Sequence, residues 1–163
     1  MERVQHGDRT AYQTLFERYQ RRIYGYLLRK TRDRQTTDDL FQETFLSVYR
    51  ARKTWKPGRK FRSWLFAIAA NASRDFVRKQ QRTLEEADAE ILLPVYPRSD
   101  ARIHLEEAIA GLPDTLRDAF LLGVVEGFTH KEVAEQLEIS PANARARISR
   151  ARAWLRDHLE GAQ

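Results

Sequence analysis

The stretch THKEVAEQLEISPANARARISRARAWL, residues 129 to 155, decides the fold because it predicts two short helices joined by a tight corner. Thr129 and Glu132 have the spacing of a capping box, in which a hydroxyl and a carboxylate bind unpaired amides of the first helical turn. Ser140 and Pro141 are typical of a second helix start, as N-cap and first helical residue. Helix, short turn and helix is the geometry that places a helix in the DNA major groove.

The second of these helices carries a dense positive charge. Residues 141 to 156 hold five arginines and no acid, whereas residues 105 to 140 hold two cations against eight acids. A solvated basic helix is the alternative, but the separation of the acids from the arginines favours contact with a polyanion. We therefore interpret the stretch as a DNA-binding helix-turn-helix whose arginines bind guanine or phosphate. Its inward stripe, at helical spacing, is expected to be Ala144, Ile148, Ala151 and Leu155.

Composition limits the class of protein. The 163 residues are 42% hydrophobic with two proline-marked junctions, which predicts two small domains. Cysteine is absent and the four histidines lack ligand spacing, so we expect no disulfide, metal or other cofactor. The longest apolar run, residues 64 to 70, is too short for a membrane span, and the first residues lack a signal-peptide core. We expect a cytoplasmic protein without membrane insertion, and the net charge of +6 favours nucleic acid as a partner.

The positive charge is concentrated near the start of the chain. Residues 1 to 82 hold 20 lysines and arginines against 8 acids, a net charge of +12. Asp8 is the expected cap of a first helix, and Thr36 or Thr37 that of a second. The second helix places Asp39, Gln42 and Glu43 on one outward face, which is conspicuous in so basic a segment. The spacing of the apolar residues predicts three helices in this segment. They cover about residues 9–30, residues 36 or 37 to 52, and residues 61–82.

A basic loop and a polar ridge follow. Residues 53 to 60, KTWKPGRK, predict a loop because of Pro57 and Gly58, and they place an aromatic side chain among cations. The next helix carries a ridge of Asn71, Arg74 and Arg78 opposite its core side. A solvated helix back is the alternative for the ridge, and a lone tryptophan in such a loop is more often core than stacking platform. Together, loop and ridge favour single-stranded nucleic acid, whose bases stack on rings while its phosphates meet cations.

The second half of the chain predicts a separate helical domain. Residues 83 to 100 are acidic, hold two prolines and show no long period, which predicts a flexible linker. Two helices separated by Pro113 are expected before Gly127, and the helix-turn-helix adds two more. We therefore predict an all-α protein without strands, made of two small helical domains, residues 1–82 and 101–163, joined by the linker.

Five motifs, in this order and spacing, resemble those of bacterial RNA polymerase sigma factors of the sigma-70 family, and more narrowly the extracytoplasmic-function (ECF) group. The resemblance covers nearly the whole chain. It implies a transcription initiation factor, not an enzyme, with sigma domain 2 of three to four helices and a four-helix sigma domain 4. The implied partners are core RNA polymerase (β′ clamp helices and β flap), promoter DNA and an anti-sigma factor. The motifs are DLFQETF (39–45), FRSWLFAIAANASRDFVR (61–78), LPDTLRDAFLL (112–122), EGFTHKEVAEQL (126–137) and ISRARAWLR (148–156).

The resemblance also implies roles for individual residues. The set implied to bind core polymerase is Asp39, Gln42, Glu43 and Phe45. The set implied to melt the −10 element and capture a flipped base is Trp55, Lys56, Arg59, Lys60, Arg62, Asn71, Arg74 and Arg78. The set implied to meet the −35 element is His130, Lys131, Ala142, Asn143, Arg145, Ala146, Arg147, Ser149 and Arg150. Arg147 and Arg152 are expected nearer the core, holding phosphate or acidic neighbours.

The chain departs from its relatives at the helix-turn-helix corner. Many of them have Gly where Glu138 stands, and a left-handed backbone there would cost this chain roughly 1 kcal/mol. Gly-Thr in place of Ala142-Asn143, and Val in place of Ala144, are also common, so a known −35 sequence does not transfer to this chain.

Two other functions fit part of the sequence. A helix-turn-helix regulator that binds duplex DNA without polymerase explains residues 112 to 156, but it leaves DLFQETF and the charge of the first 82 residues without a purpose. A metal-dependent nuclease using Asp39 and Glu43 lacks a third ligand, a histidine base and a glycine-rich phosphate loop.

Overall fold

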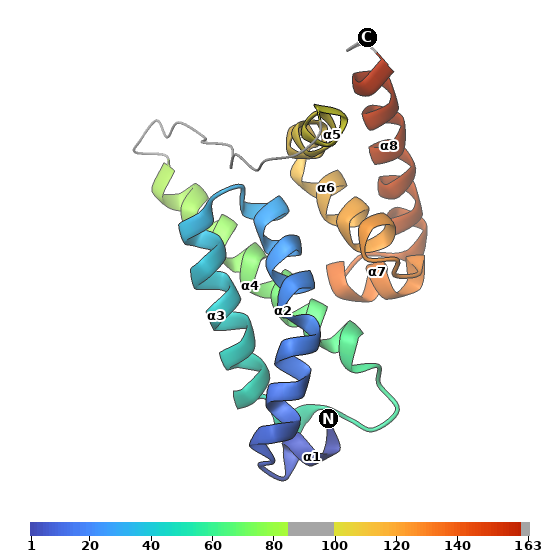
Figure 1. Ribbon diagram of the computed structural model, residues 1–163. Coiled ribbons are helices and arrows are strands. Elements are labelled where there is room, and N and C mark those ends of the chain that lie inside the picture. Colours follow the sequence, from blue (N-terminus) through green and yellow to red (C-terminus); the bar gives the residue numbers. More distant parts are fainter. Residues whose placement is uncertain (85–99, 161–163) are drawn as a thin grey trace. The chain divides into compact units, whose positions relative to one another are not determined.

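The computed structural model describes residues 1–84 and 100–160 (Figure 1). Every regular element in those residues is helical, as predicted. The chain divides into two compact units, Met1–Leu92 and Leu93–Gln163. Helix α4 continues to Leu84, and the remaining residues of the predicted linker up to 99 lie outside the described residues.

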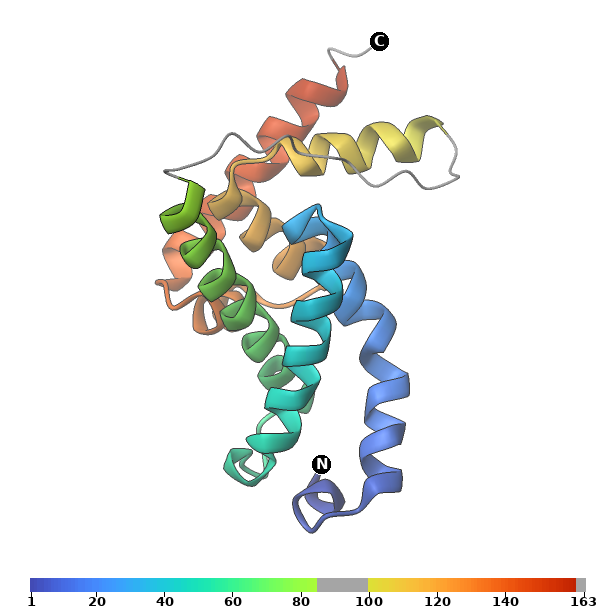
Figure 2. The same cartoon turned by 90° about the vertical axis from the view of Figure 1, so that its left-hand side faces the viewer.

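The first unit is a bundle of three long helices, preceded by a short one. Helices α2, α3 and α4 pack on one another, and α1 lies at one end of the bundle (Figure 2). Their shared core includes Ile23, Leu27, Val48 and Leu65, each at most 1% exposed. The bounds are α1 (Glu2–Gln5), α2 (Arg9–Thr31), α3 (Arg34–Arg50), a 3-10 turn η1 (Arg52–Thr54) and α4 (Phe61–Leu84).

The caps of α2 and α3 are both aspartates. Asp8 accepts a hydrogen bond from the Ala11 amide at 2.9 Å, which confirms it as the cap of α2. The prediction of a threonine cap for α3 was wrong, because Asp33 holds the cap position and accepts from the Thr36 amide at 2.7 Å. Thr37 is instead buried inside the helix. The hydrogen bonds from Thr36 hold the pKa of Asp33 below its usual value, so its carboxylate form stabilises the start of α3.

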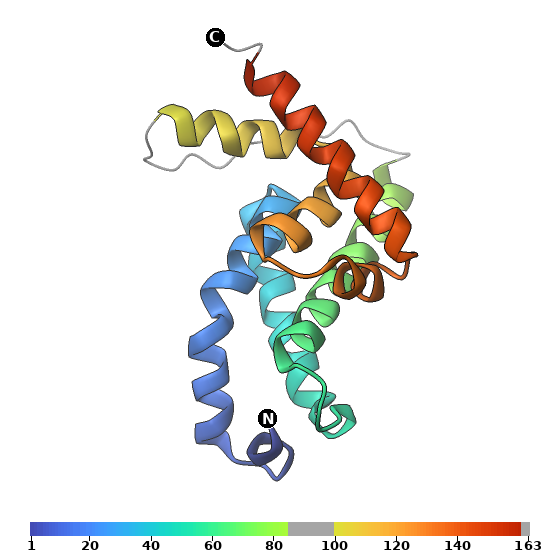
Figure 3. The same ribbon diagram turned by 90° about the vertical axis from the view of Figure 1, so that its right-hand side faces the viewer.

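Residues 100–160, the described part of the second unit, form four helices, as predicted, with a π-helical end on the second. The bounds are α5 (Asp100–Gly111), α6 (Asp114–Phe120), the π-helical stretch η2 (Leu121–Val125), α7 (His130–Leu137) and α8 (Pro141–Glu160). Helix α8 packs on α5, α6 and α7 and so carries much of the core of this unit (Figure 3). Gly123 permits this packing, because a Cβ there would lie 2.5 Å from Cδ1 of Ile148.

A buried arginine joins α5 to α6. Arg117 is 4% exposed and donates to the backbone carbonyls of Ile109, Ala110 and Leu112 at the end of α5. Its Nη1 also lies 2.6 Å from Oδ1 of Asp114. No further helical turn follows to donate to the carbonyls at a helix end, so Arg117 adds donors there, beside the 3.3 Å bond from the Leu112 amide to the Ile109 carbonyl, and fixes the corner between the two helices.

Candidate nucleic-acid and protein-binding surfaces

The helix-turn-helix has the caps that its sequence predicts. The Thr129 amide donates to Oε2 of Glu132 at 3.0 Å, and the Glu132 amide donates to Oγ1 of Thr129 at 3.2 Å. Ser140 caps α8 by accepting from the Asn143 amide at 3.1 Å. The turn between the helices places Glu138 at φ 56°, in the left-handed region, as expected from the glycine of its relatives.

The two faces of α8 differ as expected. The predicted inward stripe is buried: Ala144, Ile148, Ala151 and Leu155. The exposed members of the −35 set are His130, Lys131, Ala142, Asn143, Arg145, Ser149 and Arg150, while Ala146 and Arg147 are half-buried. Nε of Arg147 donates to Oδ1 of Asn143 at 3.1 Å, so this arginine is held along its own helix.

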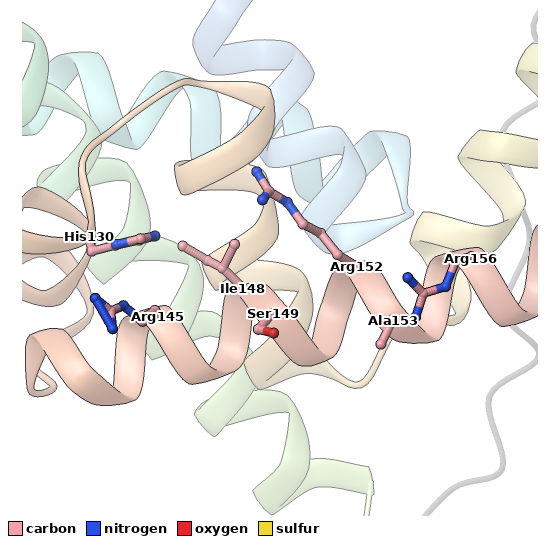
Figure 4. Close-up of a pocket in the computed structure, with 7 residues that line it drawn as sticks. All are labelled: His130, Arg145, Ile148, Ser149, Arg152, Ala153 and Arg156. Carbon is pink, nitrogen blue, oxygen red and sulfur yellow. The ribbon is translucent and has the colours of Figure 1, made fainter.

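A basic pocket lies between the start of α7 and the side of α8 (Figure 4). His130 faces Arg145 there, and Arg152 and Arg156 continue the same side of α8 toward its end. The expectation that Arg152 sits near the core was wrong, because its side chain is exposed and lines this pocket. Arg156 was counted only as charge in the sequence; its spacing of eleven residues from Arg145, three helical turns, could have placed it on the same side. The pocket is lined by His130, Arg145, Ile148, Ser149, Arg152, Ala153 and Arg156.

An acidic face stands on α3 in the otherwise basic first unit. Asp39, Gln42 and Glu43 are exposed, as predicted. Glu43 accepts from Oγ of Ser47 at 2.9 Å and lies 3.5 Å from Nη1 of Arg50. We call Asp39, Gln42 and Glu43 the α3 acidic face.

Two other residues of α3 differ from the sequence-based expectations. Phe45 was in the polymerase-binding set, but it is only 5% exposed and packs edge-on against Phe16 and Phe41. It therefore supports the α3 acidic face from inside and offers no contact surface. Leu46, which the sequence did not single out, is 50% exposed on this helix. Its spacing of three residues from Glu43, nearly one helical turn, was the signal that could have found it beside the outward face.

The loop after α3 presents some of its cations and buries others. Lys56, Arg59 and Lys60 are exposed, whereas Arg62 is half-buried with its guanidinium 5.9 Å from the Phe66 ring centroid. The Trp55 side chain is half-buried and its indole nitrogen is shielded from solvent. We call Lys56, Arg59 and Lys60 the loop cations.

The ridge on α4 is less strongly charged than the sequence suggested. Asn71 is exposed, and its Oδ1 accepts a hydrogen bond from Arg74, which is half-buried. Arg78 is exposed but pairs with Asp75 at 2.8 Å. Asp75 was not part of the predicted ridge. Its negative charge offsets the positive charge of Arg78, one of the two arginines of the ridge.

The described residues hold no group of three or more His, Asp or Glu side chains that could bind a metal ion. No helix among them is long and apolar enough to cross a membrane. Hydrogen bonds at the helix starts lower the pKa of Asp8 and of Asp33, and burial raises the pKa of Tyr12.

Family models match both units. Sigma-70 region 2 matches residues 15–83, and sigma-70 region 4 matches residues 102–155. Among curated proteins, the RNA polymerase sigma factor CarQ of Myxococcus xanthus is 38% identical over 98% of this chain and 95% of its own length. The ECF RNA polymerase sigma factor SigM of Bacillus subtilis is 32% identical over 87% of this chain and 91% of its own length.

Solved structures share the fold. CnrH, determined in complex with the cytosolic domain of CnrY, is 25% identical with a TM-score of 0.76, covering 99% of this chain and 96% of that one. The sigma factor RpoE of Bartonella quintana, determined with the anti-sigma factor NepR, has a TM-score of 0.81 over 92% of this chain and 97% of that one. At 19% identity it is evidence for the fold alone.

Proposed function

Because this chain belongs to the sigma-70 family of RNA polymerase sigma factors, in the ECF group, we propose that it directs core polymerase to particular promoters by reading two DNA elements. As a member of this family it is a transcription initiation factor. The observation that carries the proposal is the presence of basic surfaces on both compact units, one beside the helix-turn-helix and one beside the loop after α3.

The second unit would bind the −35 element as duplex DNA. The exposed side of α8 carries Arg145 and Arg150, which have the donor geometry to bind guanine or phosphate. The short side chains Ala142 and Ser149 let the helix approach base edges closely. Lys131, Arg152 and Arg156 are suited to the phosphates on either side of the groove.

The first unit would bind the −10 element as a single strand. The loop cations lie close in sequence to α4, whose exposed Asn71 can donate to and accept from a base edge. Arg74 and Arg78 add charge for the phosphates of the displaced strand. Chemistry is not required for opening: unstacking costs on the order of a few kcal/mol per step, and binding of the flipped base and strand offsets it. We therefore propose that the chain acts by binding alone, without a cofactor.

The α3 acidic face would be the contact with core polymerase, through the β′ clamp helices. An acidic patch kept exposed on a unit of positive charge is unsuited to DNA, so a basic protein surface is the complementary partner. We propose a second contact with core polymerase, between the second unit and the β flap. We therefore propose a cytoplasmic location, where these partners would be met.

We also propose that an anti-sigma factor regulates the chain. The RpoE structure contains such a partner. An anti-sigma factor of this chain would act by covering the α3 acidic face or the exposed side of α8. The chain's own residues support this only through the exposure of both surfaces.

Run-off transcription with purified core polymerase and a library of genomic fragments tests the proposal. Specific transcripts that require both proteins are expected. The rival function, a regulator that binds duplex DNA by itself, predicts specific DNA binding without polymerase and no transcripts. That result would overturn the proposal.

A further inference from the structure

The short helix α1 holds one end of the first unit together. It packs on η1, and α1 lies at the same end of the bundle as the segment that follows α3. Val4 is 1% exposed, which anchors α1 through an apolar contact. Nη2 of Arg3 lies 2.7 Å from Oδ2 of Asp8, the N-cap of α2, so the corner between α1 and α2 is also fixed.

Gln5, the last residue of α1, is tied to the loop after α3. Its Nε2 donates to the backbone carbonyl of Trp55 at 2.7 Å, a bond between residues 50 positions apart in sequence. The indole nitrogen of Trp55 is also buried, without an acceptor among the residues the structure describes. Trp55 is therefore turned toward the bundle, while Lys56 and Arg59, next in the chain, are exposed.

We propose that Gln5 is a positioning residue for promoter opening: its bond to Trp55 fixes the backbone from which the loop cations project toward the displaced strand. The inference rests on the proposed function and adds to it a residue that does not itself reach DNA. A loop already held in its binding conformation loses less conformational entropy when the strand binds. Binding of the −35 duplex, which uses the other unit, does not depend on this bond.

Two variants of Gln5 and one matched control test the proposal. Gln5→Glu keeps the shape of the side chain, but the ionised carboxylate has no N–H to donate. Gln5→Leu removes the donor without adding charge. Gln35→Glu is the control, because Gln35 is exposed near the start of α3, about 22 Å along that helix from the loop at its end, and the charge change is the same.

The first measurement is made on the free protein. Hydrogen exchange followed by mass spectrometry is expected to become faster across residues 52–60 in both Gln5 variants and to stay unchanged in Gln35→Glu. The Thr54 amide donates to the Ala51 carbonyl and the Arg59 amide to the Lys56 carbonyl, so both amides report the change. Equal exchange in all proteins would show that the bond does not hold the loop. Loss of protection throughout the first unit in both Gln5 variants would make Gln5 a structural residue and also overturn the proposal.

The second measurement follows promoter opening with core polymerase, using a fluorescent base analogue in the −10 region. Opening is expected to slow about three- to tenfold in both Gln5 variants, the size of one neutral hydrogen bond. A promoter already mismatched at −10 should restore nearly normal complex formation, which a general loss of folding would not permit. Faster loop exchange with unchanged opening overturns the positioning role. Failure of all variants and the wild type to bind polymerase would refute the proposed function instead, and leave the exchange result standing.

Discussion

Nε of Arg147 donates a hydrogen bond to Oδ1 of Asn143, one helical turn earlier on α8, at 3.1 Å. The bond occupies the Asn143 carbonyl oxygen and turns the arginine along its own helix. Arg145 lies between them in sequence, is exposed, and faces the basic pocket beside His130. Of these two arginines, Arg145 is therefore the one that we propose contacts a base edge.

Arg145→Ala should relax the preference for the native −35 sequence. A bidentate arginine contact to guanine discriminates by about 1–3 kcal/mol, so substituted −35 elements should bind nearly as well as the native one. Competition binding of the holoenzyme to single-base variants of the −35 element measures this. Arg156→Ala, at the far end of the pocket, is the comparison and should weaken all sequences alike. If Arg145→Ala instead weakened binding to every −35 sequence by the same factor, Arg145 would contact phosphate and not a base.

Glu138→Gly should stabilise the second unit by up to about 1 kcal/mol, because glycine adopts the left-handed conformation without a Cβ penalty. The φ of Glu138 is 56°. Glu135→Gly is the control: this residue is exposed inside α7, where glycine costs about 1 kcal/mol. Thermal unfolding should show a higher melting temperature than wild type for Glu138→Gly and a lower one for Glu135→Gly. A less stable Glu138→Gly protein would mean that the contacts of the glutamate outweigh its strain.

Arg117→Met should destabilise the second unit by about 2–4 kcal/mol, because it removes the buried donor to three carbonyls at and just after the end of α5. Asp114→Asn removes only the ion pair, whose acidic member is 61% exposed, and should cost less than about 1 kcal/mol. Urea unfolding measured by the fluorescence of Trp154, in this unit, compares them. Similar losses for the two variants would show that the carbonyl bonds contribute little.

The helices and their buried faces were predictable because the apolar residues recur at helical spacing over long segments. The capping box of Thr129 and Glu132 is equally local and was confirmed. Helix α1 was missed because four residues are too few to show a period. The cap of α3 was misassigned because several neighbouring side chains were suitable, and the extended backbone of Asp33 at φ −131° decides between them.

Surface residues were harder to predict wherever long side chains can turn either way. Phe45 lies in the segment that the resemblance assigns to polymerase binding, yet the aromatic packing around Phe16 buries it. Arg152 is next to the buried stripe in sequence, but its long side chain reaches the pocket at the surface. The bond from Gln5 to Trp55 had no sequence signal, because it depends on how α1 folds back on the bundle.

Glu43→Lys should weaken binding to core polymerase at least about tenfold, or about 1.4 kcal/mol, while leaving the fold intact. The Glu43 side chain is 50% exposed and its ion pair with Arg50 is long, so stability depends little on it. Glu17→Lys, an exposed charge reversal on α2, is the control and should bind normally. Fluorescence anisotropy with core polymerase measures both, and unchanged affinity for Glu43→Lys would refute the role of the α3 acidic face.

Asn71→Ala should impair promoter opening more than closed-complex binding, because we propose that the ridge contacts DNA only after the strands separate. Asn71 also accepts a hydrogen bond from Arg74, so alanine removes both a base-contacting amide and a partner for that arginine. Asn71→Asp separates these roles, since aspartate still pairs with Arg74 but cannot donate to a base. Permanganate reactivity of −10 thymines reports opening, and filter binding at low temperature reports the closed complex.

If the amide contacts the flipped base, both Asn71 variants should open the promoter about tenfold more slowly, which corresponds to about 1.4 kcal/mol. If Asn71 acts by holding Arg74, aspartate should restore opening and alanine should not. An equal loss of closed-complex binding and of opening would remove Asn71 from strand separation, because the defect would then precede melting.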